Sequence, residues 1–131
     1  GLIDFVDQST MGLIRQVTDR EPPGSQQAAR IVALLFQFAE KNPGMSRVMI
    51  GDALVLEHER LQERINLLFD KIEAQLRQTL KASDSTTLTA DAQVTASVLV
   101  AFMQGRLQRF ARTGFKRLPS EHLQAALARV L

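Results

Sequence analysis

The sequence has no cysteine, tryptophan or tyrosine among its 131 residues. Without cysteine, neither disulfide bonds nor thiolate chemistry is available, which fits a cytoplasmic protein. The missing tryptophan and tyrosine argue against a surface on which nucleic-acid bases stack, although seven phenylalanines remain. No apolar run is long enough to span a membrane, so we expect no membrane partner.

Residues suited to catalysis are scarce as well. The only histidines are His58 and His122, and no glycine-rich phosphate loop or nucleophile elbow occurs. A carboxylate-bound metal centre in a helical bundle needs Glu-x-x-His on two helices, and that spacing is absent. His58 therefore fits a solvated helix surface better than a metal ligand. We expect no enzyme, no metal site and no cofactor.

What the sequence does have is apolar residues, which make up 45% of a chain long enough for one domain with one core. The stretch Glu57–Leu80 dominates, because its apolar residues recur every three or four positions, as on one face of an α-helix. The opposite face is charged, so this long helix needs partner helices against its apolar face. The apolar positions are Leu61, Ile65, Leu68, Ile72, Leu76 and Leu80.

Similar periodicity predicts further helices on both sides of this stretch and no strand, so the expected fold class is all-α with five or six helices. Turns that contain proline, glycine or polar residues separate the helices. We expect Ser25, Asp52 and Thr89 to be N-caps. The second helix is apolar nearly all round, which is typical of a central helix. Besides the long helix, we expect helices at about 2–17, 25–41, 45–50, 89–111 and 121–131.

The helix expected at 89–111 has one face of small and apolar residues. Ala101 and Gly105 lie four positions apart beside Val98 and Phe102, so another helix can approach this face closely. Packing within the chain and a dimer interface explain the face equally well. With the last helix, each subunit would contribute two helices to a four-helix interface. The residues expected there are Val98, Ala101, Phe102, Gly105, Phe110, Leu123 and Leu127.

Net charge is only +2, but five basic residues and no acidic residue lie between Arg106 and Arg117. Arg106, Arg109, Arg112 and Lys116 step by three, three and four, so a helix that continued to Lys116 would carry one basic stripe. Such a stripe fits an anionic partner, either nucleic-acid phosphate or an acidic peptide. A solvated flank of the interface helix explains it equally simply, and we favour that interpretation.

Large apolar residues are also in surplus around the second and third helices. They suit a small-molecule pocket among the helices, although at helical spacing such residues more often form the core. The residues concerned are Leu34, Phe36, Phe38, Met45, Met49 and Phe69.

Three segments resemble one known family. The stretch EKNPGMSRVMIGDALVLEHERLQERINLLFDKIEAQLRQTL (40–80), LIDF (2–5) and LQRFARTGFK (107–116) are similar to the SlmA-like nucleoid-occlusion factors, which are TetR-type regulators of Gram-negative bacteria. The resemblance covers essentially the whole chain and is strongest at 60–80. It implies a TetR-type C-terminal regulatory and dimerisation domain over 1–131.

The resemblance carries further expectations about partners. It implies a homodimer formed through the last two helices and a helix-turn-helix domain before Gly1. DNA would be bound only through that preceding domain, and the protein would be associated with the nucleoid. Members of this family antagonise the division protein FtsZ, partly by gripping its C-terminal tail.

In this family the FtsZ-contacting surface involves the first and central helices of the domain. The matching positions are Phe5, Leu34, Lys41 and Asn42, a small apolar patch with a cation and an amide at its edge. Core packing for Leu34, and an ordinary helix end for Lys41 and Asn42, are the alternatives. The chain departs from the best-known member of the family at two positions, because it has Leu13 and Gln37 where Arg and Gly are expected.

Two other functions remain open at this point. A ligand-sensing TetR-type repressor would hold a cavity of several hundred cubic ångströms with convergent polar groups under the long helix. The second possibility is a helical interaction domain without a DNA-binding domain. Helix-turn-helix patterning upstream of Gly1 would exclude it, because DNA readout needs a recognition helix.

Overall fold

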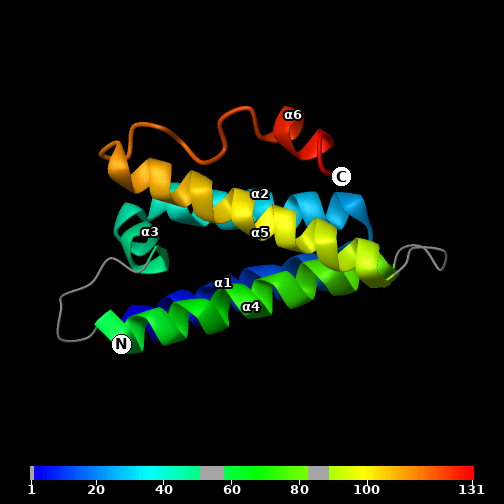
Figure 1. Ribbon diagram of the computed structural model, residues 1–131, viewed down its shortest axis with the longest axis horizontal. Helices are drawn as coiled ribbons and strands as arrows, with labels where there is room; N and C mark the ends of the chain where they lie inside the picture. The colour runs from blue at the N-terminus through cyan, green and yellow to red at the C-terminus, as the bar shows by residue number, and fades with distance from the viewer. Residues whose placement is uncertain (1, 51–57, 83–88) are drawn as a thin grey trace.

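The computed structural model describes residues 2–50, 58–82 and 89–131 (Figure 1). All regular structure in these residues is helical, which confirms the prediction of an all-α fold with five or six helices. None of the described helices is long and apolar enough to cross a membrane. The helices are α1 (Leu2–Arg20), α2 (Ser25–Lys41), α3 (Pro43–Met49), α4 (His58–Ala82), α5 (Thr89–Arg112) and α6 (Leu123–Ala128).

The helices form two layers. Figure 1 shows α1 beside α4 in one layer and α2 beside α5 in the other, with α3 at one end and α6 outside α2. The long helix α4 makes its most extensive contact with α5. Its predicted apolar face is buried at five of six positions, because Ile65, Leu68, Ile72, Leu76 and Leu80 are at most 8% exposed, whereas Leu61 is half-buried.

The core is formed mainly by α2, α4 and α5. Phe36, at the centre of α2, is fully buried and its ring centroid lies 5.9 Å from that of Phe102 on α5. Of the residues considered for a ligand pocket, Phe36, Met49 and Phe69 belong to this core. The other three, Leu34, Phe38 and Met45, are half-buried at its edge.

The turn between α1 and α2 corrects two predictions. Helix α1 continues to Arg20, three residues beyond the expected end. Gly24, and not Ser25, occupies the N-cap position of α2, and it does so with φ 148°, which side-chain-bearing residues rarely adopt. Ser25 is therefore the first helical residue. The expected N-cap at Asp52 lies outside the described residues, and Thr89 is the first helical residue of α5 and not its N-cap.

A buried hydrogen-bond chain ties this turn to α4. The Thr79 hydroxyl accepts a bond from the Gly24 backbone N–H at 3.2 Å and donates to the Gln27 side-chain oxygen. The Gln27 amide in turn donates to the Glu21 carbonyl oxygen at 2.7 Å. Gln27 and Thr79 are 3% and 5% exposed, so their polar atoms depend on one another in place of water.

We expect Thr79→Val to lower the free energy of unfolding by about 1–3 kcal/mol, because it leaves the Gly24 N–H and the Gln27 oxygen without their partner. Urea denaturation of the two proteins measures the difference. Thr18→Val is the matched control, since the Thr18 hydroxyl donates to the Arg15 carbonyl oxygen at an exposed site. Equal stability of wild type and Thr79→Val would show that the chain contributes nothing.

Two exposed ion pairs join α1 to α4 and show that the helices run in the same direction. Asp4 pairs with Arg64 at 2.5 Å, and Asp7 pairs with Lys71 at 3.1 Å. The Arg64 guanidinium lowers the pKa of the Asp4 carboxyl to about 2, mainly through their hydrogen bond. Because three of the four side chains are at least 40% exposed, the pairs fix orientation more than they stabilise the fold.

Helix α5 ends within one residue of its predicted end, and the region after it is less helical than expected. Helix α5 ends at Arg112, because Gly114 and Phe115 adopt left-handed conformations with φ 64° and 67°. The last helix spans only Leu123–Ala128, and His122 before it is also left-handed. The short third helix begins earlier than predicted, at Pro43, which suits the first turn because proline has no N–H to satisfy.

Candidate functional site

The four residues expected to contact a partner do not share one cleft. Leu34 lines a cleft between α2 and the segment before α6, whereas Phe5 lies 52% exposed near the start of α1. Lys41 is exposed in the last turn of α2, and Asn42 follows it. Among the described lining residues of the Leu34 cleft, neither Phe5, Lys41 nor Asn42 occurs.

Asn42 connects α2 to α3. Its backbone N–H bonds the Phe38 and Ala39 carbonyl oxygens, and its side-chain amide donates to the Phe38 oxygen at 2.9 Å. These bonds satisfy the end of α2, and Pro43 then begins α3. The alternative interpretation of Asn42 as an ordinary helix terminus is therefore supported by the structure.

The Leu34 cleft has a volume of about 320 Å³ and a mixed lining. The Ser120 hydroxyl donates to one Glu40 carboxylate oxygen at 3.0 Å and so joins the C-terminal segment to α2. The other Glu40 oxygen is buried and has no hydrogen-bond partner among the described residues. The lining residues are Arg30, Ala33, Leu34, Gln37, Glu40, Ser120 and Leu123.

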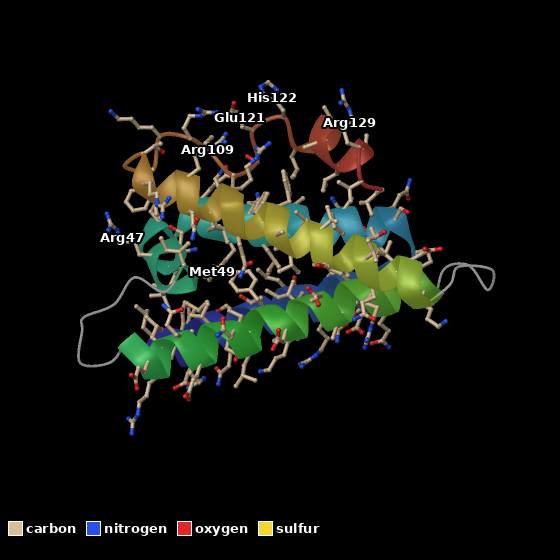
Figure 2. All side chains as sticks on the ribbon, in the orientation of Figure 1. Arg47, Met49, Arg109, Glu121, His122 and Arg129 are labelled. Carbon is tan, nitrogen blue, oxygen red and sulfur yellow. The ribbon has the colours of Figure 1, made fainter. Side chains whose placement is uncertain are left out.

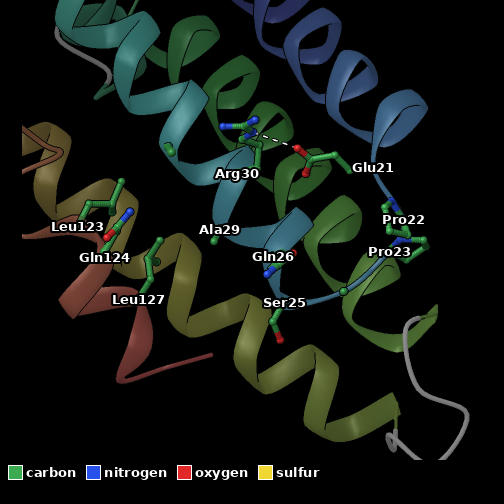
Figure 3. Close-up of a pocket in the computed structure, with 12 residues that line it drawn as sticks. Glu21, Pro22, Pro23, Ser25, Gln26, Ala29, Arg30, Leu123, Gln124 and Leu127 are labelled. Carbon is green, nitrogen blue, oxygen red and sulfur yellow. Dashed lines mark hydrogen bonds and ion pairs between the residues drawn. The ribbon is translucent and has the colours of Figure 1, made fainter.

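A larger cleft of about 720 Å³ adjoins it at the start of α2 (Figure 3). Ser25, Gln26 and Ala29 of α2 face Leu123, Gln124 and Leu127 of α6 across this cleft. Arg30 and Glu21, which also line it, form an ion pair at 3.1 Å. The two clefts share Arg30, Ala33 and Leu123, so they make one continuous surface groove along α2.

Sequence reasoning missed Arg30, Glu40 and Ser120 as lining residues of this groove. A signal was present: Gln26, Arg30, Gln37 and Glu40 recur at steps of four, seven and three on a helix that is otherwise apolar nearly all round. A polar strip of this kind marks the face that the core does not cover. The segment around Ser120 approaches that strip only in the folded chain.

The two described clefts that α4 lines are open to the surface as well. One of about 240 Å³ lies beside Thr79 and another of about 400 Å³ beside Ile3 and Arg64. The space between α4, α2 and α5 is filled by core side chains such as Leu68, Leu76 and Phe36, each at most 1% exposed. This packing matches a domain that acts through its surface.

The expected dimer face is exposed only in part. Val98 is 45% exposed, and Ala101 and Gly105 are also exposed, with no atom within 4 Å of a Cβ at Gly105. Val94, one turn earlier and 62% exposed, extends the same face. We define the outer face of α5 as Val94, Val98, Ala101 and Gly105.

The remaining residues of the expected interface are less accessible. Phe110 and Leu127 are 1% and 5% exposed within the subunit, so their side chains belong to its own core. Phe102 is half-buried between Phe36 and the Arg106 guanidinium, which lies 4.8 Å from its ring centroid. Leu123 is half-buried in the groove along α2.

The condition for one continuous basic stripe is not met, because α5 ends at Arg112 and Lys116 follows the left-handed turn. Arg106 is also not a free cation. Its guanidinium donates to the Pro119 and Glu121 carbonyl oxygens at 3.2 and 2.5 Å and holds the C-terminal segment against α5. Only Arg109 and Arg112 remain as exposed cations of the helix itself.

No metal or catalytic constellation emerges from the described residues. No three acidic, histidine or cysteine side chains among them lie close enough to hold a metal ion. The His122 side chain is 79% exposed and lies 3.7 Å from the Glu121 carboxylate. Nothing is described of the His58 side chain.

Comparison with known proteins identifies the family to which the domain is similar. The family model described as "Tetracyclin repressor-like, C-terminal domain" of the SlmA-like type matches residues 26–129. The chain is 39% identical over 128 residues to nucleoid occlusion factor SlmA of Idiomarina loihiensis, and 41% identical over 125 residues to that of Shewanella oneidensis. These alignments cover 95% and 93% of this chain and 65% and 64% of the relatives. The chain thus spans slightly less than two thirds of their length.

Proposed function

Because the chain belongs to the family of SlmA-like, tetracycline-repressor-like C-terminal domains, we propose that it is the regulatory domain of a DNA-binding nucleoid-occlusion factor that inhibits cell division by acting on FtsZ. The observation that carries this proposal is the 39% identity to a nucleoid occlusion factor, in an alignment that covers 95% of the chain. Sequence-specific DNA binding would belong to a helix-turn-helix domain in the part of such proteins that this chain does not span.

The proposed partner is the C-terminal tail of FtsZ, and the proposed contacts are Phe5, Leu34, Lys41 and Asn42. The exposed Phe5 ring and the half-buried Leu34 side chain offer apolar contacts on α1 and α2. Lys41 offers an exposed cation at the end of α2. Apolar anchors with a charge at the edge are a common way to bind a short peptide.

Titration of the domain with a fluorescent FtsZ C-terminal tail peptide tests the proposal. We expect saturable micromolar binding that Lys41→Ala weakens about 3- to 10-fold, because an exposed charged contact is worth on the order of 1 kcal/mol. Arg20→Ala is the matched control, since Arg20 is likewise an exposed cation in the last turn of a helix. We expect it to leave the affinity unchanged.

Two results would contradict the proposed contacts. Equal weakening by Lys41→Ala and Arg20→Ala would show that only net charge matters. Absence of binding, also when the domain is joined to its DNA-binding domain and bound to DNA, would remove the FtsZ tail as a partner.

We further propose a homodimer in which the outer face of α5 meets its symmetry mate. Support comes from the residues exposed there, since Val94 and Val98 are large apolar side chains in contact with solvent. Ala101 and Gly105 continue the face with little steric bulk, which lets two helices approach closely. A two-fold axis would bring the same face of each subunit together, with α6 near its edge.

A further inference from the structure

The connection between α5 and α6 reaches α2 and is held there mainly by polar contacts. We define the strap as residues 116–122. Figure 2 shows its Glu121 and His122 on the outer side of the bundle, with the His122 ring directed away from it. The only large apolar side chain of the strap, Leu118, is 47% exposed, and Pro119 is its one buried residue. Apolar burial therefore contributes little to the position of the strap.

Two contacts anchor the strap to different helices. From α5, the Arg106 guanidinium donates to the carbonyl oxygens of Pro119 and Glu121 at 3.2 and 2.5 Å. From α2, the Glu40 carboxylate accepts the Ser120 hydroxyl at 3.0 Å. No other hydrogen bond joins the strap to α2 among the residues that the structure describes. The hold of the strap on α2 thus depends on Ser120.

The contact with Glu40 is incomplete. The second carboxylate oxygen of Glu40 is buried and has no hydrogen-bond partner in the described part of the chain. A buried carboxylate oxygen normally accepts a hydrogen bond, because losing its water without replacement is unfavourable. The closed strap therefore sets one hydrogen bond against one desolvated oxygen, and opening would let water reach that oxygen. A contact that only stiffened the chain would satisfy both oxygens.

Leu34 lies in the cleft beside this contact. It is half-buried and lines the cleft of about 320 Å³ together with Ser120 of the strap and Leu123 directly after it. A partner that uses Leu34 as an apolar anchor therefore meets the strap at the edge of its site. Left-handed residues lie at both ends of the strap, with φ 67° at Phe115 and 52° at His122. Rotation at such positions moves a segment while α5 and α6 stay helical.

We propose that the strap is an autoinhibitory element that restricts the access of a partner to Leu34. Release of Ser120 from Glu40 opens the cleft. This inference rests on the proposed function, because Leu34 is one of the proposed contacts with the FtsZ tail. The closed form lowers the apparent affinity for the tail in proportion to the fraction of molecules that are open. Loss of the Ser120 hydroxyl should raise that fraction roughly 2- to 10-fold, the range expected for one hydrogen bond.

Access to the cleft can be measured without FtsZ, because the sequence contains no cysteine. Leu34→Cys places a single thiol in the cleft, and its rate of reaction with a fluorescent maleimide follows the open population. Adding Ser120→Ala should accelerate the reaction roughly 2- to 10-fold. Adding Ser97→Ala, which removes a hydroxyl from an exposed position of α5, should leave the rate unchanged. A thiol placed by Phe5→Cys on α1 should react equally fast with and without Ser120→Ala.

The second measurement titrates the FtsZ tail peptide into proteins that retain Leu34. Ser120→Ala should tighten binding by the factor by which it accelerates labelling, since both follow the open population. Equal labelling of Leu34→Cys with and without Ser120→Ala would overturn the strap, whatever the peptide does. Faster labelling with unchanged peptide affinity would overturn autoinhibition and leave the FtsZ proposal intact. Absence of peptide binding to wild type and variant alike, also in the DNA-bound protein, would remove the FtsZ function and its regulation together.

Discussion

Replacing Val98 with glutamate is expected to convert the proposed dimer to monomers, which would run at the 14.6 kDa mass of the single chain. Val98 is 45% exposed in the subunit and lies at the middle of the outer face of α5. A two-fold axis would place two glutamates in or near one apolar contact, where neither finds a cation on the mating face. Light scattering after gel filtration measures the mass directly.

Leu67→Glu provides the control for this experiment. Leu67 is also a large exposed apolar residue, 55% exposed, but it lies on α4 and away from the outer face of α5. We expect this variant to keep the wild-type mass. A Val98→Glu protein that remains dimeric, or a wild-type chain that is monomeric at high concentration, would contradict the proposed interface.

Replacing Phe36 with alanine is expected to lower the free energy of unfolding by about 3–5 kcal/mol, because the ring is fully buried and a cavity remains after its loss. A domain of this size is stable by only about 5–15 kcal/mol, so the variant would approach unfolding at 37 °C. The ring also contacts Phe102 of α5, and that contact between the two helices of one layer is lost with it. Urea denaturation of both proteins gives the difference.

Phe5→Ala is the matched control, since it removes the same side chain from a site that is 52% exposed. We expect a change within about 0.5 kcal/mol in stability, as for most surface substitutions. A small effect of Phe36→Ala would show that the core is not organised around α2. A large effect of Phe5→Ala would show that its ring is structural and not available to a partner.

The helical framework was predictable because local signals agreed with one another. Helix α2 begins and ends at Ser25 and Lys41 as expected, since Pro22, Pro23 and Gly24 precede it and Asn42-Pro43-Gly44 follows it. The apolar face of α4 was likewise predictable from the spacing of its apolar residues alone. Such signals are short-range, so they identify elements without specifying which faces meet.

Errors arose where conformation depends on one or two residues or on distant contacts. The stripe to Lys116 required a continuous helix, but Gly114 and Phe115 reverse the chain after Arg112. Phe110 had the right spacing for an interface, yet the packing of Phe115 against it places it in the core. Periodicity cannot separate the face buried within a chain from the face buried between chains.

The groove along α2 shows the same limit. Ser120 and Glu40 are eighty positions apart, and their hydrogen bond depends on Arg106 holding the segment near Pro119 and Glu121. Each residue taken alone looks like an ordinary surface residue. Leu34 was identified through family resemblance, and the structure adds that it lines this groove with Gln37, where the best-known relative is expected to have glycine.

An FtsZ assembly measurement would show whether the factor that we propose to contain this domain acts on FtsZ. The domain, joined to its proposed helix-turn-helix domain and bound to DNA, would be added to FtsZ, and the sedimented FtsZ polymer would be measured. We expect the wild-type protein to lower the sedimented fraction and Lys41→Ala to restore much of it, whereas Arg20→Ala does not. Undiminished FtsZ assembly in the presence of the DNA-bound wild-type protein would rule out the proposed action on FtsZ.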